Sequence, residues 1–490
     1  MIWLLARRNI ADRPLRSALL LFGYGLGVAV MVVLLSVGEA LLTQARDERL
    51  IGGGQITVLP EGIDVEVMKT GGLGGMFFSI GHARFVQLQL LDSPRLAPLV
   101  AAVAPQIDRK LVYLTAGGRQ HPVRATGDIP SMTSAVGGAP DFARGTWADD
   151  DADRRWRRPE RGELNDDIDH FHLPPPGASA ESWAEWHYFN VLSADNQRWI
   201  FITYMVAGDV PDGRWGGQLL VTVREQGGRT RRFTSRALPS KIRFSLADAD
   251  VAIGESRVDA RADGRYAITG SAMEDGGGSR VTFDFVVEPE PRAYFPGATL
   301  REGTTLSGYT VPGLRASATG KLCVDGRCED YRGAQSYKDH NWGTWSGVTW
   351  EWGATRAGPF SLLYGVVHAP DREAAEAPLF LYLVDSLGFR ALFRPRRISY
   401  EDARTIQVDG KAVRVPARAV LADVRGADTI RVELTIEDAI GTDIRRTLME
   451  RGTVLLHPYF IQMKGRARLS GRVGGTVIAG EGTGFFETYR

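Results

Sequence analysis

The hydrophobic positions of the chain form one long apolar run near its start and many short runs after residue 180. Residues 17–38 are twenty-two residues without a charged side chain. As a helix rising 1.5 Å per residue they would span about 33 Å, enough to cross the ~30 Å hydrocarbon core of a membrane. The pattern therefore predicts one transmembrane helix, and no other stretch has enough consecutive apolar residues to span.

The residues in front of this run set its expected orientation. They include one acid, Asp12, and four arginines: Arg7, Arg8, Arg13 and Arg16. Because an excess of arginine marks the cytoplasmic end of a membrane helix, we expect a single-pass membrane protein. Its N-terminus would be cytoplasmic and its remaining domains would lie on the other side of the membrane. A cleaved signal peptide is the alternative, but residues 37–40 lack a small-x-small cleavage site.

From residue 183 onward the pattern is that of β structure. Short runs of valine, threonine and aromatic residues are separated by turn signals. Alternation along the first run places Glu185 and His187 on one face, and Trp186 and Tyr188 on the other. Strands without helical patterns between them predict antiparallel sheets that are closed, or nearly closed, into barrels. We expect two consecutive barrels that meet near residue 345.

Composition places the boundaries between these regions. Residues 142–180 are rich in charge and end in a proline-led stretch, which is typical of a linker. The expected fold class is mainly β, with one transmembrane helix and a small α+β segment before the barrels. The expected parts are residues 1–45 (cytoplasmic stub and membrane helix), 46–145 (small domain), 146–180 (linker), 181–345 (first barrel) and 346–490 (second barrel).

Charge and cysteine content narrow the classes of function. The net charge is +1 and there is no basic tract, so nucleic acid is not an expected partner. The two cysteines flank an Asp-Gly turn in Cys323-Val-Asp-Gly-Arg-Cys328. Such a turn makes Cys323 and Cys328 a directly opposed hairpin pair, within disulfide distance. We predict a disulfide between them and an oxidising compartment, with a reduced pair as the alternative.

Two motifs concentrate the candidate chemistry. One is Tyr337-Lys-Asp-His-Asn-Trp-Gly-Thr-Trp345, followed by Trp350-Glu-Trp352, and the other is Trp183-Ala-Glu-Trp-His-Tyr188. Each combines a carboxylate, an imidazole and aromatic faces. We interpret the two motifs as opposite walls of one apolar cavity. The alternative is that these side chains are core residues around a satisfied Asp-His hydrogen bond.

This combination of residue types suits the protonation of an alkene. A carboxylic acid in an apolar pocket has a raised pKa and can donate a proton, and aromatic faces stabilise the cation that forms. The candidate catalytic residues are Asp339, His340, Trp342 and Glu185. The candidate ligand-binding residues are Trp186, Tyr188, Trp345, Trp350, Glu351 and Trp352.

A histidine pair in the expected linker is the one candidate for metal binding. His170 and His172 have only Asp169 beside them, and the chain holds eight histidines in all. Packing of the linker on the next domain explains them better than a metal site, which needs further ligands at suitable spacing. We expect neither a metal nor a cofactor.

The N-terminal part resembles a known family. Leu5-Ala-Arg-Arg-Asn-Ile10, Arg16-Ser-Ala-Leu-Leu20 and Phe22-Gly-Tyr-Gly-Leu-Gly27 are similar to the first membrane helix of FtsX-like permeases, the membrane subunits of macrolide-export and lipoprotein-release ABC transporters. Residues 55–145 resemble a shortened form of the periplasmic core domain of these permeases. The resemblance implies ABC transporter permease and ATPase subunits as partners. It also implies a bacterial inner membrane as the location, with the domains after the membrane helix in the periplasm. The family has three further membrane helices, so this chain alone is not expected to form a translocation pathway.

Residues 165–490 resemble a second family. Trp183-Ala-Glu-Trp186, Asp339-His-Asn-Trp-Gly343 and Gly484-Phe-Phe-Glu487 are similar to motifs of the AttH and carotenoid hydratase (hydroxyneurosporene synthase) family, which includes kievitone-hydratase-type enzymes. The resemblance implies two lipocalin-like barrels and, between them, a cofactor-free pocket for isoprenoid-like or other hydrophobic ligands. His340 and Trp342 match the hydratase motif residue for residue. A downstream Tyr-x-Asp of the hydratases is not matched, which favours binding over catalysis.

Three functions follow as hypotheses. The first is a membrane-anchored, extracytoplasmic lipocalin-like protein that binds a lipid or isoprenoid-like molecule and works with an ABC transporter. The second is a cofactor-independent hydratase, cyclase or isomerase acting on such a molecule. The third is a structural component whose cavity is filled by side chains. An enzyme requires Asp339 or Glu185 to be buried, within hydrogen-bond reach of His340 and facing the cavity. A carrier requires an open cavity without an acid of strongly raised pKa. Indoles of Trp342–Trp352 that interlock without a void would favour the structural component.

Overall fold

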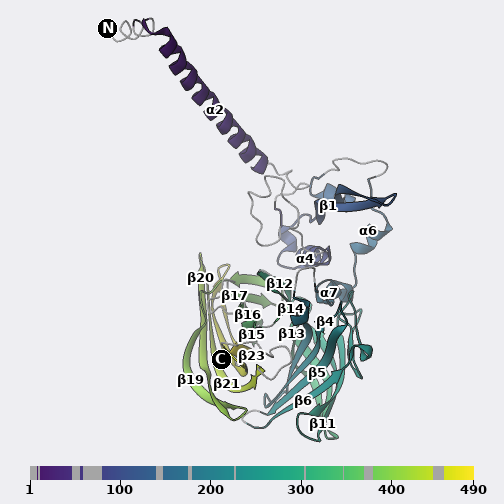
Figure 1. Cartoon of the computed structure of the whole chain (residues 1–490). Coiled ribbons are helices and arrows are strands. Elements are labelled where there is room, and N and C mark those ends of the chain that lie inside the picture. Colours follow the sequence, from purple (N-terminus) through teal and green to yellow (C-terminus); the bar gives the residue numbers. More distant parts are fainter. Residues whose placement is uncertain are drawn as a thin grey trace. The chain divides into compact units, whose positions relative to one another are not determined.

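The computed structural model of the 490-residue chain describes residues 8, 12–46, 56–58, 80–138, 147–174, 179–225, 228–302, 305–345, 347–368, 379–444 and 457–490. These residues form two compact units, which are described separately. One unit is residues 1–80 with 102–154, and the other is residues 81–101 with 155–490. The protein is mainly β, as its sequence predicts (Figure 1).

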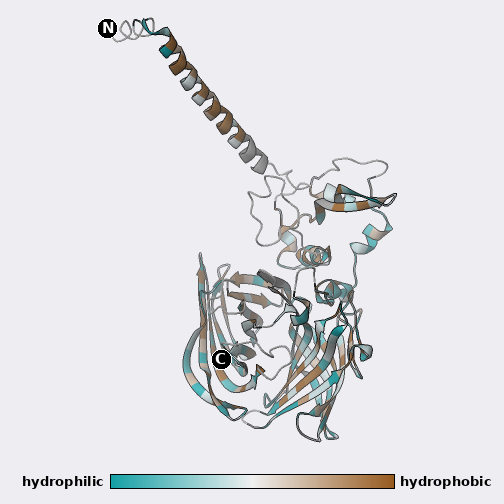
Figure 2. Cartoon of the chain, in the orientation of Figure 1, coloured by the Kyte–Doolittle hydropathy of each residue, from teal (hydrophilic) through white to brown (hydrophobic). Residues whose placement is uncertain are grey.

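The first unit contains the apolar helix. Helix α2 (Pro14–Arg46) begins at a proline, which suits the first turn because its missing N–H needs no partner there. The segment Pro14–Gly38 has 25 residues and a mean hydropathy of 2.5, and it is long and apolar enough to cross a membrane. The most apolar stretch of this segment is not buried by other described residues. Figure 2 shows the hydrophobic positions along the helix. The prediction of one apolar helix near the N-terminus is confirmed.

A hairpin and short helices complete the first unit. Strands β1 (Gln106–Ala116) and β2 (Arg119–Asp128) pair antiparallel across a turn at Gly117 and Gly118. Both glycines have positive φ, which a two-residue hairpin turn of this kind requires. Helices α5 (Pro130–Ala135) and α6 (Asp151–Trp156) follow. The likeness of residues 55–145 to a permease core domain stays a prediction, and much of residues 47–79 lies outside the described part of the chain.

The second unit holds two antiparallel sheets. The first sheet has twelve strands, and eight of them form a closed ring in the order β11, β13, β14, β3, β4, β5, β6 and β10, because β10 also pairs with β11. Strands β7, β8 and β9 extend this sheet from β10, and β12 pairs with β13. The strands are β3 (Trp183–Leu192), β4 (Arg198–Asp209), β5 (Arg214–Glu225), β6 (Thr230–Ala237), β7 (Ile242–Phe244), β8 (Val251–Ile253), β9 (Ser256–Ala260), β10 (Tyr266–Glu274), β11 (Arg280–Pro289), β12 (Phe295–Glu302), β13 (Thr305–Val324) and β14 (Arg327–Thr344).

The second sheet has nine strands in the order β18, β17, β16, β15, β23, β22, β21, β20 and β19. They are β15 (Thr349–Ala357), β16 (Phe360–His368), β17 (Phe380–Asp385), β18 (Gly388–Phe393), β19 (Ser399–Val408), β20 (Lys411–Arg425), β21 (Asp428–Asp443), β22 (Tyr459–Val473) and β23 (Thr476–Tyr489). Among the described residues, no pairing joins the edge strands β18 and β19. Hydrogen bonds therefore close the first sheet. The second sheet is curved (Figure 1), its first strand β15 pairs with its last strand β23, and it is open between β18 and β19 among the described residues.

Each sheet encloses its own apolar core, and a third core lies between the sheets. The cores of the first and second sheets consist of the inward-pointing residues, which alternate along each strand with outward-pointing ones. The third core is rich in aromatic residues and joins β14 and β3 of the first sheet to β15, β16 and β17 of the second. Its members include Tyr309, Tyr337, Trp345, Trp352 and Phe380. The region where both candidate motifs lie is therefore an interface between two sheets.

Helix α7 (Arg161–Asp169) and the residues after it pack on the first barrel. The Phe171 N–H donates to the Ser245 carbonyl at 3.1 Å, and the Phe171 ring lies in the barrel core. Gly162 lies so close to the backbone just after β9 that a Cβ at this position would be 2.6 Å from the carbonyl oxygen of Arg261. Residues 146–180 were expected to be a linker. Within this range, α7 and Phe171 pack on the barrel, because Asp169 and Phe171 find partners inside it.

Helix α4 (Ile80–Asp92) also belongs to the second unit. Arg84 donates from Nε and Nη2 to both carboxylate oxygens of Asp167 on α7, each at 2.7 Å. Phe85 is buried and its ring lies edge-on to Tyr294, with centroids 4.7 Å apart. Residues 46–145 were expected to be one domain, but because of these contacts they contribute to both units.

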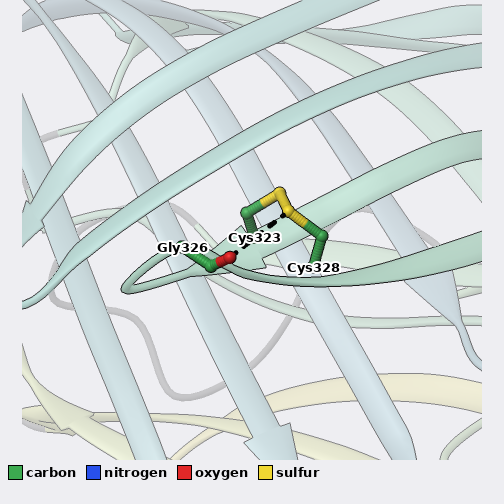
Figure 3. Close-up of a disulfide and its surroundings, with 3 residues drawn as sticks. All are labelled: Cys323, Gly326 and Cys328. Carbon is green, nitrogen blue, oxygen red and sulfur yellow. Dashed lines mark hydrogen bonds between the residues drawn. A yellow bond between two sulfur atoms is a disulfide. The ribbon is translucent and has the colours of Figure 1, made fainter.

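The predicted disulfide is confirmed. Cys323 is the second-last residue of β13 and Cys328 the second residue of β14, and the two are directly opposed in the hairpin. Figure 3 shows the bond between their sulfurs. Their Cα atoms lie 3.9 Å apart. The turn between them depends on Asp325 and Gly326, both with positive φ. The local sequence was therefore sufficient to predict this crosslink.

Loss of this disulfide is expected to destabilise the second unit by about 2 kcal/mol. Closing a loop of roughly six residues removes about this much chain entropy from the unfolded state. Unfolding of the detergent-solubilised chain by urea, followed by tryptophan fluorescence, should show the loss in a Cys323→Ser/Cys328→Ser variant. Reduced wild-type protein is the control and should behave like the variant. Equal urea midpoints for the variant and the oxidised wild type would contradict the prediction.

Candidate functional site

The two candidate motifs lie on neighbouring strands. Strands β3 and β14 pair antiparallel, with His340 opposite His187, Trp342 opposite Glu185 and Asp339 opposite Tyr188. The prediction that the motifs form opposite walls of one cavity is therefore wrong. They lie side by side in one sheet because a long hairpin, β13 and β14, brings the second motif back beside the first.

Alternation along β14 separates Asp339 from His340. Side chains of successive strand residues point to opposite faces. His340 points into the first barrel, where it contacts Asp169. Asp339 points to the interface between the sheets, where Tyr337 and Asn341 donate to it. The expected Asp339–His340 pair does not form, and the two residues belong to different sites.

Inside the barrel, His340 lies between two carboxylates. Its Nδ1 is 3.1 Å from Asp169 Oδ1, and its Nε2 is 2.9 Å from Glu185 Oε1, at an angle outside hydrogen-bond geometry. All three side chains are buried. Burial alone would lower the pKa of His340, but the two carboxylates raise it above its ordinary value. The geometry therefore favours a charged imidazolium.

Lys338 completes this buried charge network. It lies on the same face of β14 as His340, is fully buried, and its ammonium contacts Asp169 Oδ1. Tyr266 donates to the other oxygen of Asp169 at 2.7 Å. Burial would raise the pKa of Asp169, but Lys338 and His340 hold it well below its ordinary value. The carboxylates of Asp169 and Glu185 thus face the cations of Lys338 and His340. Buried charges need such partners, because the attraction between them offsets the loss of hydration.

His172 and Trp342 cover the end of this network. The backbone N–H of His172 donates to both oxygens of Glu185, and its Nδ1 lies 2.9 Å from Oε1. The indole of Trp342 stacks on the imidazole of His172 with centroids 4.0 Å apart. Because of these contacts, the predicted catalytic residues Glu185, His340 and Trp342 hold the segment after α7 onto the barrel.

Two groups of the described residues have the spacing of metal ligands. They are Asp169, His187 and His340, and His172, Glu185 and His340, with donor atoms within 4.8 Å. In the first group, Lys338 already contacts the Asp169 oxygen that would bind the metal. In both, a metal would have to displace the proton that two carboxylates stabilise on His340. The ion pairs account for the arrangement without a metal.

On the other face of β14, Asp339 is the centre of a hydrogen-bonded chain. Tyr337 Oη donates to Asp339 Oδ2 at 2.8 Å, and Trp352 Nε1 donates to Tyr337 Oη at 2.9 Å. Asn341 Nδ2 donates to Oδ1 at 2.8 Å. Only 5% of Asp339 is exposed. Burial and repulsion by Glu487 raise the pKa of Asp339 to about 7.

Glu487 of β23 is the second acid of this face. Trp350 Nε1 donates to its Oε2 at 2.8 Å, and Gln462 Nε2 lies 3.4 Å from its Oε1. Burial of the carboxyl raises the pKa of Glu487 to about 7, although the residue as a whole is half-buried. We call Asp339 and Glu487 the carboxyl pair. Near neutral pH such a pair can supply both a proton donor and a proton acceptor.

Aromatic side chains surround the carboxyl pair. Trp186 and Trp345 have centroids 4.8 Å apart, Trp345 and Trp350 are edge to face at 5.5 Å, and Tyr188 lies 6.2 Å from Tyr337. Trp186, Tyr188 and Trp350 are half-buried. The predicted ligand-binding residues Trp186, Tyr188, Trp345, Trp350 and Trp352 thus share a face with Asp339.

Glu351 is the exception among the predicted ligand-binding residues. It follows Trp350 on β15, so its side chain points to the opposite face. There it accepts hydrogen bonds from Tyr400 and, at 2.9 Å, from Thr488, and lies 3.7 Å from Arg490. Glu351 therefore lies on the face of β15 that is turned away from the carboxyl pair.

The sequence analysis did not identify three residues that complete the buried charge network and the carboxyl pair. Asp169 lay in the expected linker, and Lys338 stood inside the first motif without an assigned role. Glu487 stood in the Gly484–Glu487 motif but was not considered as an acid. Strand alternation would have placed Lys338 with His340 and Tyr337 with Asp339. Asp169 was noted only as the acid beside His170 and His172, and no local signal linked it to His340, which is 171 residues away.

Comparisons with known proteins concern the fold. No family model and no curated protein matches the chain. AttH from Nitrosomonas europaea matches with 15% identity over 65% of this chain and 100% of its own, with a TM-score of 0.44. Kievitone hydratase from Nectria haematococca matches with 14% identity over 66% and 94% (TM-score 0.41), and CghA bound to Sch210972 with 13% identity over 66% and 96% (TM-score 0.40). At these identities and TM-scores the activity of this chain does not follow from the similarity.

Proposed function

We propose that this protein is a membrane-anchored enzyme that transfers protons to and from a hydrophobic, lipid or isoprenoid-like substrate, as hydratases, cyclases and isomerases do. The observation that carries the proposal is the carboxyl pair: two acids with pKa values of about 7 among half-buried indole and phenol rings. Ordinary carboxyls are ionised at neutral pH and donate protons poorly. The apolar surroundings match a hydrophobic substrate, and the proton chemistry requires no cofactor.

The reaction can be written with these side chains alone. A protonated carboxyl, Asp339 or Glu487, adds its proton to one carbon of a C=C bond, and the adjacent carbon becomes a cation. Neighbouring indole faces stabilise that cation by their quadrupoles. Addition of water to the cation, with loss of a proton to the other carboxylate, gives an alcohol. Attack by a second C=C bond on the cation gives a cyclic cation, which becomes neutral by losing a proton to the other carboxylate. Without such an attack, loss of a different proton from the first cation to that carboxylate gives an isomer.

The test uses heavy water and the full chain in detergent. A lipid extract of the membrane in which the protein is made is incubated with the protein in D2O and analysed by mass spectrometry. Hydration adds one D2O to a molecule, whereas isomerisation or cyclisation leaves the formula unchanged except for one deuterium. We expect one such product to appear with the wild type and to be absent with Glu487→Gln. No deuterium incorporation into any extracted molecule would contradict the proposal.

A binding protein is the second candidate, and the half-buried aromatic surface favours it. Trp186, Tyr188 and Trp350 offer apolar area for a ligand whether or not a proton moves. Native mass spectrometry of the purified chain would detect a hydrophobic molecule that is lost in Trp350→Ala. A bound molecule that takes up no deuterium would favour the carrier, and its association with ABC transporter subunits could then be tested by co-purification.

Membrane anchoring is assigned to α2 in this proposal. Deleting residues 1–45 removes the 25-residue apolar segment and is expected to move the protein from the membrane fraction to the soluble fraction. Cell fractionation followed by immunoblotting measures this. A matched control replaces the segment with an unrelated single-pass helix and should restore membrane recovery. If the truncated chain stays in the membrane fraction, α2 is not the sole anchor.

A further inference from the structure

A polar cavity of about 360 Å³ lies between the two sheets, apart from the carboxyl pair. Strands β5 and β6 of the first sheet and β19 and β21 of the second contribute to its lining. Three arginines face it, Arg224, Arg232 and Arg404, against two acids, Asp409 and Asp438. The cavity therefore has an excess of positive charge.

Asp438 is fully engaged by one of these arginines. Arg224 donates from Nε and Nη2 to the two oxygens of Asp438, each at 2.8 Å, and the Ala439 N–H donates to Oδ1 at 3.0 Å. Arg232 donates from Nη2 to the Gly441 carbonyl at 2.6 Å, a neutral partner. The charge of Asp438 is thus matched by Arg224.

Arg404 has two guanidinium nitrogens without a hydrogen-bond acceptor. Its Nη1 donates to the Glu437 carbonyl at 3.0 Å, whereas its Nε and Nη2 are buried and have no hydrogen-bond partner. Among the described arginines it is the one in which both of these atoms are buried without a hydrogen-bond partner. Burial lowers the pKa of Arg404, with Asp438 opposing this effect, so the cation lies in an unfavourable environment.

In three other arginines of this protein, the same two nitrogens, Nε and Nη2, bind a carboxylate. Arg84 with Asp167, Arg224 with Asp438 and Arg231 with Glu274 all use Nε and Nη2 for two parallel hydrogen bonds. This fork fits the two oxygens of a carboxylate or phosphate group. A buried fork without an acceptor is unfavourable because its donors have lost water and gained no partner.

We infer that the cavity binds the phosphate or carboxylate group of a small anionic molecule, with Arg404 as its bidentate donor and Arg232 as the second cation. The site is independent of the carboxyl pair. Because both sheets contribute ligands, the bound anion joins β6 of the first sheet to β19 of the second. Binding should therefore stabilise the second unit.

The experiment measures the thermal unfolding of the full chain in detergent by tryptophan fluorescence. Chloride is exchanged for inorganic phosphate, citrate or a short-chain phosphatidic acid at constant ionic strength. We expect a saturable rise in Tm in the wild type. A response to inorganic phosphate assigns a free oxyanion, and a response to phosphatidic acid alone assigns a lipid headgroup. No saturable rise with any of the three probes would overturn the inference.

Variants assign the effect to Arg404. Arg404→Met removes the unpartnered fork, so in chloride its Tm should equal or exceed that of the wild type, and its affinity for the anion should fall at least tenfold. Arg404→Lys keeps the charge but not the fork and should bind about tenfold more weakly. Arg414→Met, an exposed arginine on β20, is the matched control and should behave as wild type. If Arg404→Met does not fold, Arg404→Lys decides: anion affinity equal to that of the wild type would overturn the assignment.

Discussion

Replacement of Asp169 by asparagine is expected to lower the free energy of unfolding of the second unit by about 3–5 kcal/mol. Asp169 is fully buried and its carboxylate is shared by Lys338, His340 and Tyr266. Without its charge, the Lys338 ammonium has no partner of opposite sign in direct contact among the described residues. Removal of one partner from a buried ion pair has effects of this size.

The measurement is urea unfolding followed by tryptophan fluorescence, since most of the eleven tryptophans lie in the second unit. Asp330→Asn, an exposed aspartate on the same strand as Lys338, is the control and should leave the midpoint unchanged. The double variant Asp169→Asn/Lys338→Met should recover part of the loss, because it removes both charges. Additive effects of the two single changes would show that the pair does not interact.

The same change should alter the dependence of stability on pH. Lys338 and His340 lower the pKa of Asp169, so below the ordinary carboxyl pKa of about 4 the unfolded chain binds a proton that the folded chain does not. The stability that Asp169 contributes is present above about pH 4 and is lost as the pH falls. Asp169→Asn should therefore lose less stability than the wild type between pH 7 and pH 3.

Conversion of either member of the carboxyl pair to its amide is expected to reduce turnover by about 10²–10⁴-fold, the usual contribution of a general acid or base. Deuterium incorporation into the product, measured for Asp339→Asn and Glu487→Gln, checks this. Glu481→Gln, an exposed glutamate on the same strand as Glu487, is the matched control and should retain full activity. Full activity in both amide variants would refute the assignment of the carboxyl pair.

The pH profile of turnover should be bell-shaped and centred near pH 7. Both pKa values are raised to about 7, so the two carboxyls titrate as a coupled pair. At low pH both are protonated and the base is lost, and at high pH both are ionised and the acid is lost. A profile that is flat from pH 5 to pH 9 would contradict this mechanism.

Replacing Asp339 by asparagine should raise the stability of the protein at alkaline pH, although it lowers turnover. Because the pKa of Asp339 is raised, the folded chain binds more protons than the unfolded chain between about pH 4 and pH 7, and stability falls as the pH rises through this window. Asp339→Asn does not titrate, so at pH 8 it should be more stable than the wild type, by at most about 4 kcal/mol. A variant that is inactive yet more stable would identify a group retained for function and not for folding.

The sequence alone determined the features that depend on local pattern. The uncharged run of residues 17–38 was sufficient for helix α2, because length and apolarity decide membrane compatibility. Strand alternation correctly assigned Glu185 and His187 to one face of β3 and Trp186 and Tyr188 to the other. The Asp-Gly turn fixed the Cys323–Cys328 disulfide, since a two-residue turn sets the register of its hairpin.

The tertiary structure decided which of these residues act together. Asp339 and His340 are adjacent in sequence, yet alternation points them to opposite faces of β14. The acids that complete the two sites, Asp169 and Glu487, come from distant segments that only the packed sheets bring close. Their pKa values depend on burial and on neighbouring charges, which no local pattern encodes. The identity of each site was therefore settled by the packing of the sheets, because a carboxyl becomes an acid at neutral pH only where the fold removes water from it.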